Sequence, residues 1–132
     1  MNLKNLKFKT FFLLIALAFS LTTIASADGI RKHIKFARGK SSATVSGAVV
    51  RGDRDVYTIG ARENQKMTVK ITSPEKNAVF QIRKANGDFL SGADEGDDAT
   101  SWSNALPTTG DYEIVVGGTR GNASYKLTVT IK

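Results

Sequence analysis

The sequence predicts an all-β fold, an antiparallel β-sandwich of the jelly-roll or immunoglobulin-like kind in a single domain. Three observations predict it. In short runs, apolar side chains occupy every second position, as expected when one face of each strand is buried. Turn residues (Gly, Pro, Asn and Asp) separate these runs at intervals of about 8–12 residues. Beyond residue 27, no stretch has a convincing helical periodicity.

The strands are expected in a regular series along the chain. The clearest is 125–131, where Tyr, Leu, Val and Ile alternate with Lys and Thr. Asn86-Gly87 favours a tight hairpin leading to a short strand near Phe89. Trp102 and Leu106 are expected in the core near a strand end. The other strands are expected around 34–36, 43–50, 57–61, 67–72, 80–84 and 112–116.

The first 27 residues have the features of a removable export signal. Three lysines precede an uninterrupted apolar run, 11–19, and Ala25-Ser26-Ala27 matches the small-residue pattern of a signal-peptidase site. The run is too short to span about 30 Å of hydrocarbon comfortably; an uncleaved anchor is the alternative. We therefore predict a β-sandwich domain over 28–132 that is exported, periplasmic or secreted, with no membrane span in the mature protein.

Composition limits the classes of partner. The chain contains no cysteine, so apolar burial and hydrogen bonds must stabilise the exported domain without disulfides. Three of the 19 basic residues lie in the predicted signal, which leaves 16 basic and 12 acidic residues and a net charge of +4. This modest excess favours an acidic partner but falls short of the basic stripe of a nucleic-acid-binding protein.

Catalysis has little support, and no enzyme activity or cofactor is expected. His33 is the one histidine of the sequence, so a Ser/His or thiol mechanism would need an unusual base. The densest acidic stretch suggests a weak calcium site, because carboxylates in a glycine-containing loop can wrap Ca²⁺. Its spacing does not match an EF-hand, and a solvated turn is favoured. The candidate ligands are Asp94, Glu95, Asp97 and Asp98.

From about Ile34 to Lys132 the sequence resembles the bacterial pre-peptidase C-terminal-like β-sandwich family. Within that family it resembles the exported proteinaceous inhibitors of goose-type (g-type) lysozyme. Most of the matching positions are core and turn residues, so they are more specific for fold than for function. The motifs are Phe36-Ala-Arg-Gly39, Val45-Ser-Gly47, Tyr57-x-Ile-x-Ala61-Arg62, Gln65-x-Met67-x-Val69, Asn77-Ala-Val-Phe80, Leu106-Pro-x-Thr-Gly110-Asp-Tyr112 and Tyr125-x-Leu-x-Val129.

The resemblance implies that the protein blocks a peptidoglycan hydrolase, with polar and basic loop residues entering the acidic cleft of the enzyme. The corresponding turns would be 51–55 and 117–122. The inhibitors are expected to have a tyrosine in the first turn and arginines in the second. This chain has Asp53 and Arg54 in the first turn and keeps Arg120 in the second.

Arginine suits this role because its planar guanidinium donates two parallel hydrogen bonds to a carboxylate. The arginines of the two turns would share one rim if the ends of their strands meet. Two alternatives remain open: scattered solubilising charges, or a non-catalytic module for surface glycan or another exported protein, with Trp102 and the tyrosines as stacking platforms. The residues expected to contact g-type lysozyme or another glycan hydrolase are Arg51, Asp53, Arg54, Arg120 and Asn122.

Overall fold

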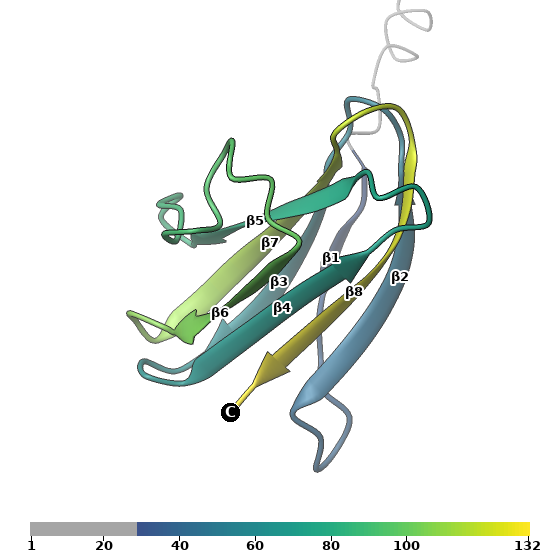
Figure 1. Cartoon of the computed structure of the whole chain (residues 1–132). Helices are drawn as coiled ribbons and strands as arrows, with labels where there is room; N and C mark the ends of the chain where they lie inside the picture. Colours follow the sequence, from purple (N-terminus) through teal and green to yellow (C-terminus); the bar gives the residue numbers. More distant parts are fainter. Residues whose placement is uncertain (1–28) are drawn as a thin grey trace, which may run out of the picture.

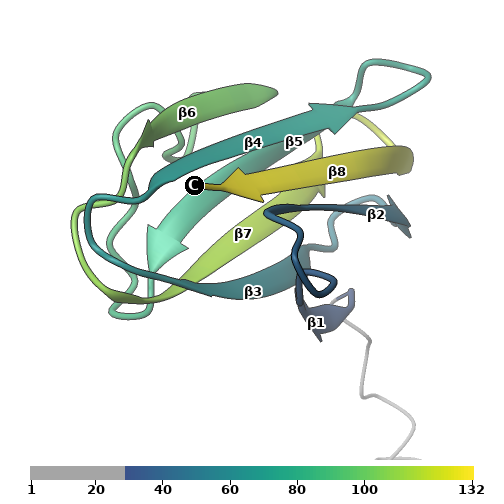
Figure 2. The same cartoon turned by 90° about the horizontal axis from the view of Figure 1, so that it is seen from below.

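The computed structural model describes residues 29–132, which form eight strands in two four-stranded sheets. The sheets are stacked as two layers (Figure 2). The predicted all-β sandwich is confirmed, whereas the predicted export signal lies outside the described residues. The first sheet has the order β1 (Arg31–His33), β3 (Asp55–Ala61), β7 (Gly110–Gly118), β5 (Ala78–Lys84), and the second has the order β2 (Ser42–Val49), β8 (Ala123–Ile131), β4 (Lys66–Thr72), β6 (Ser101–Ala105).

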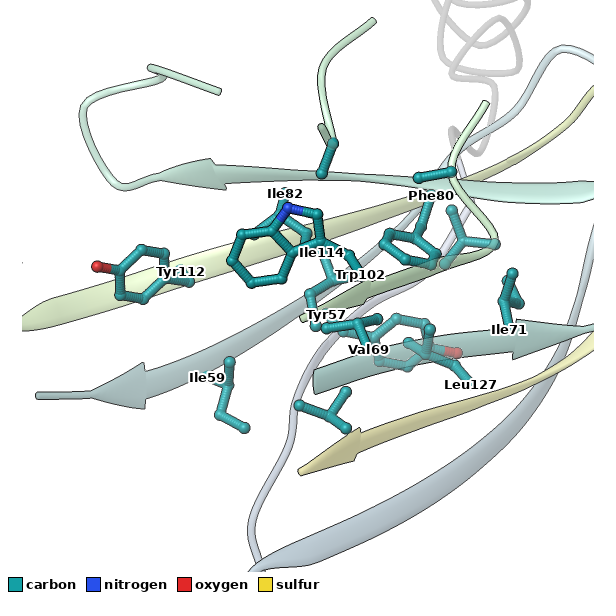
Figure 3. Packing of buried hydrophobic residues seen from close by; sticks show 14 of the residues in the cluster. Tyr57, Ile59, Val69, Ile71, Phe80, Ile82, Trp102, Tyr112, Ile114 and Leu127 are labelled. Atoms are coloured by element: carbon teal, nitrogen blue, oxygen red, sulfur yellow. The ribbon is translucent and has the colours of Figure 1, made fainter. Parts of the chain in front are cut away.

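The core lies between the two sheets and is built from the alternating apolar positions (Figure 3). In β8, for example, Tyr125, Leu127 and Val129 are buried, whereas Lys126 between them is exposed. Trp102 is also buried, as predicted, and its indole N–H donates a hydrogen bond of 2.9 Å to a backbone carbonyl oxygen, so its polar atom is satisfied inside the protein. Residues 29–132 include no helix of the kind a bilayer-spanning segment requires.

The first strand differs from the prediction in place and direction. It was expected around 34–36 in an antiparallel sheet, but β1 covers Arg31–His33 and pairs with β3 in parallel. Backbone contacts hold it there: the N–H of Val56 donates to the carbonyl of Ile30, and the N–H of Ile34 donates to the carbonyl of Thr58. His33 therefore lies within a strand rather than before one.

A second difference concerns the segment after β5. The turn predicted at Asn86-Gly87 is present, with Gly87 at a φ of 94°, but Phe89 forms only an isolated bridge to Arg83 instead of a strand. The strand that follows is β6, which was not predicted. Within β6 only Trp102 is buried, so the segment has no alternating apolar pattern.

Residues 88–99 run along the outer edge of β5. The N–H groups of Phe80, Ile82 and Lys84 donate to carbonyl oxygens of this segment at 2.9, 2.9 and 2.8 Å. An exposed strand edge is a template for pairing with another chain. Here a segment of the same chain covers that edge.

Two turns meet at one end of the sandwich, and we call 62–65 and 106–109 the corner end. Leu106 is fully buried, and its N–H and carbonyl exchange hydrogen bonds with the 62–65 turn. The hydroxyl of Tyr112 donates to the carbonyl of Thr108 at 2.6 Å. This is the geometry of a tyrosine corner, in which a tyrosine at a strand start bonds back to the upstream backbone.

Candidate functional site

The two turns predicted to carry contact residues lie beside one another at the end opposite the corner end (Figure 1). A hydrogen bond joins them directly, since the backbone N–H of Arg51 donates to Oδ1 of Asn122 at 2.8 Å. We call the three turns at this end (50–54, 73–77 and 119–122) the loop end. The structure thus brings together the turns that carry all five predicted contact residues.

The 50–54 turn is short and internally bonded. The N–H of Asp53 donates to the carbonyl of Val50 at 2.9 Å, and Gly52 has a φ of 84°, which suits glycine. Arg51 and Gly52 therefore form an exposed tip, whereas Asp53 is half-buried. The tip presents one guanidinium group to solvent.

Arg54 follows the turn and folds back over the first sheet. Its guanidinium donates to the carbonyl of Asp53 at 3.1 Å and lies over Gly117, where an added Cβ would come within 2.9 Å of Nη1. A cleft of about 370 Å³ on this outer face is lined by Arg54 together with Glu95 and Asp98. Two carboxylates therefore share the surroundings of Arg54, which makes it a weaker candidate for an acidic partner than the arginines at the tips.

The 119–122 turn is held by Asn77, a buried residue of the neighbouring turn that stands in one of the matching motifs but was not expected at the site. Its side-chain amide donates to the carbonyls of Arg120 and Asn122 at 3.0 and 2.9 Å. Its own Oδ1 accepts from the hydroxyl of Ser73 at 2.9 Å. Two signals in the sequence pointed to it: its place in the Asn77-Ala-Val-Phe80 motif, and a polar residue directly before an apolar strand.

Arg120 lies at the exposed tip of this turn. Its Nη2 donates to the carbonyl of Glu75 at 2.9 Å, which fixes the direction of the side chain. A guanidinium has five N–H donors, and this is the one hydrogen bond that the Arg120 side chain forms within residues 29–132. Most of its donors are therefore available to a partner.

A buried polar cluster lies beneath the loop end. Asp55, which is 2% exposed, accepts hydrogen bonds from the hydroxyl of Tyr125 at 2.6 Å and from the N–H of Ile30 at 3.0 Å. Because Tyr125 donates to Asp55, the hydroxyl of Tyr57 must donate to Tyr125, at 2.6 Å. Burial, and next the hydrogen bond to the carboxylate, raises the pKa of Tyr125 far above its usual value, and burial also raises the pKa of Tyr57. The cluster anchors the start of β3, directly after Arg54.

The acidic stretch, residues 94–98, forms a turn in which carboxylates accept hydrogen bonds from backbone N–H groups of the same turn. Oδ2 of Asp97 accepts from the N–H of Asp94 at 2.9 Å, and Oδ1 of Asp94 accepts from the N–H of Glu95. Across the described range, no three His, Cys, Asp or Glu side chains are grouped closely enough to hold a metal ion. The structure therefore does not assemble the weak calcium candidates, which included Asp98, into a site.

The aromatic platforms proposed for a glycan-binding module are not accessible. Trp102 is 8% exposed, and Tyr57, Tyr112 and Tyr125 are 3% exposed or less. A sugar ring needs an exposed aromatic face for stacking, so these four residues cannot supply it. That part of the alternative interpretation is wrong.

Comparison with known proteins identifies relatives. No protein-family model matches the chain. An inhibitor of g-type lysozyme from Escherichia coli K12 is 31% identical to it, over 91% of this chain and 92% of the relative.

Solved structures agree with this sequence match. The crystal structure of a periplasmic inhibitor of g-type lysozyme from Aeromonas hydrophila matches with a TM-score of 0.67 and 32% identity, over 80% of this chain and all of the other. The pre-peptidase C-terminal domain of a Bacillus anthracis collagenase matches with a TM-score of 0.60 and 16% identity, over 82% of this chain and all of that domain, and shows the shared fold alone. This chain belongs to the family of periplasmic inhibitors of g-type lysozyme.

Proposed function

We propose that this protein inhibits a g-type lysozyme in the periplasm by placing side chains of the loop end in the acidic cleft of the enzyme. It acts by binding and performs no chemistry itself. The observation that supports this most is the hydrogen bond between the N–H of Arg51 and Oδ1 of Asn122, which joins the two arginine-bearing turns.

The rigidity of the loop end supports an inhibitory role. Binding is opposed by the entropy lost when loops and side chains become ordered, so a surface that is already ordered binds more tightly. Asn77 and Asn122 fix the backbone of both turns before any partner arrives. Arg120 is then the side chain best placed to meet a carboxylate, because its guanidinium is exposed and points in a defined direction.

A titration tests this proposal. The purified exported protein is added to a goose-type and, in parallel, to a chicken-type lysozyme, and cell-wall lysis is followed. We expect inhibition of the goose-type enzyme, and we expect Arg120→Ala to weaken it about 10- to 100-fold, or about 1–3 kcal/mol.

The matched control is Arg62→Ala, which removes an exposed arginine from the corner end. It should inhibit as well as the wild type does. Normal goose-type lysozyme activity in a large excess of the protein would contradict the proposal. Equal losses in the two arginine variants would show that net charge, and not the loop end, determines binding.

A further inference from the structure

We propose that Lys76, on the 73–77 turn, is a further contact residue of the enzyme-binding surface, next to Arg120. This inference rests on the proposed function and names a residue in a turn that the predicted contact set did not include. Three features support it: the place of the turn, the backbone conformation of Lys76, and the charge of its side chain.

The 73–77 turn is built into the loop end. The carbonyl of Asn77 accepts the N–H of Thr119 at 2.9 Å, and the carbonyl of Glu75 accepts Nη2 of Arg120 at 2.9 Å. Lys76 lies between these two acceptor residues, so its backbone is fixed against the turn that carries Arg120. A partner that reaches Arg120 also meets Lys76.

The backbone of Lys76 is in a conformation that lysine rarely adopts. Among residues 29–132, three non-glycine residues have a positive φ: Asn64 at 69°, Asp98 at 48° and Lys76 at 54°. Asn and Asp visit this left-handed region because their short polar side chains bond locally, but lysine has no such advantage. Glycine or asparagine would fit better, and such outliers gather at binding sites. The lysine therefore needs a reason other than the turn itself.

The side chain supplies that reason. Lys76 is exposed, and the ion pairs of residues 29–132 include neither Lys76 nor Arg120. The neighbouring acidic group is the exposed carboxylate of Glu75, which forms no ion pair with either. The loop end thus carries four cations (Arg51, Arg54, Lys76 and Arg120) against the two carboxylates of Asp53 and Glu75, with at least one cation on each turn, as suits an acidic cleft.

Lys76→Gly relaxes the left-handed backbone and also removes the ammonium group. The first change should not lower stability and the second should weaken inhibition, so the two measurements distinguish the roles of backbone and charge. We expect a melting temperature no lower than that of the wild type, together with inhibition weakened about three- to tenfold at low salt. The loss should shrink in about 0.5 M salt, where the Debye length is only a few ångströms. Lys76→Arg keeps the charge and should inhibit nearly as well as the wild type.

Two variants, one in the corner end and one directly beside it, are the matched controls. Asn64→Gly relaxes the same backbone conformation, and Lys66→Ala removes the same charge from an exposed position. Both should inhibit as the wild type does. If Lys76→Gly inhibits fully at low salt while Arg120→Ala does not, the inference is overturned and the proposed function stands. If the wild type itself leaves goose-type lysozyme untouched, both are overturned.

Discussion

The two ends of the sandwich are closed in different ways. At the corner end, the backbone of Leu106 bonds directly to the backbone of the 62–65 turn, and Tyr112 bonds back to Thr108. At the loop end, side-chain amides add to one backbone bond, from the N–H of Thr119 to the carbonyl of Asn77: the Asn77 amide donates to the carbonyls of the 119–122 turn, and Asn122 accepts from the N–H of Arg51.

The two ends differ in which parts of their turns these bonds hold in place. At the corner end these bonds fix Leu106 in the core, while Arg62, Glu63 and Asn64 stay exposed. Amide side chains reach across from one turn to the next, so the tips can stay exposed while their backbones are fixed. The corner end therefore closes the core with Leu106, whereas at the loop end the exposed guanidinium of Arg120 is held in a defined direction.

The largest effect is expected from Asn77→Ala. This change removes the amide that satisfies two carbonyls and one hydroxyl, in a residue that is 1% exposed. We expect a loss of about 3 kcal/mol in the free energy of unfolding, measured by urea denaturation, together with weaker lysozyme inhibition because the Arg120 turn is released. A loss below about 1 kcal/mol would show that Asn77 does not hold the loop end.

Tyr125→Phe should have the next largest effect and should change the response to alkali. Losing the hydrogen bond to the buried carboxylate of Asp55 is expected to lower stability by about 2 kcal/mol. The raised pKa values of Tyr125 and Tyr57 contribute stability that is present below pH of about 10 and is lost as the pH rises above it. The wild type should therefore lose stability in alkali more steeply than the variant, in denaturation curves from pH 8 to 11. Equal slopes would contradict this account.

The smallest effect is expected at the corner end. Tyr112→Phe removes the hydroxyl that bonds to Thr108 but keeps the ring in the core, so stability should fall by about 1 kcal/mol. Inhibition measured on the folded variant should equal that of the wild type. Weakened inhibition would mean that the two ends are coupled through the sheets, and the contrast between them would be lost.

Much of the fold was predictable because burial on one face imposes a period of two. This holds for β8 and β4, where every second residue is buried and apolar. It fails for β6, which buries Trp102 alone, and for β1, whose three residues are all exposed. Those two strands are placed by hydrogen bonds to distant segments, and such bonds leave no local pattern.

The candidate site was predictable only in part. The arginine-bearing turns could be located, because glycine, asparagine and arginine cluster between alternating runs. Asn77 could not be recognised, since its partners Arg120 and Asn122 lie 43 and 45 residues away in the sequence. Nor could the left-handed backbone of Lys76, because nothing in the residue itself favours that conformation.

The covering of β5 by residues 88–99 has a consequence for self-association. The donors of Phe80, Ile82 and Lys84 already have carbonyl acceptors, so a second molecule arriving at that edge finds no free row of N–H groups to extend the sheet. The covering segment also carries five carboxylates, Asp88, Asp94, Glu95, Asp97 and Asp98, so two such edges repel each other at neutral pH. Neutralising those charges should leave the edge closed by its hydrogen bonds alone.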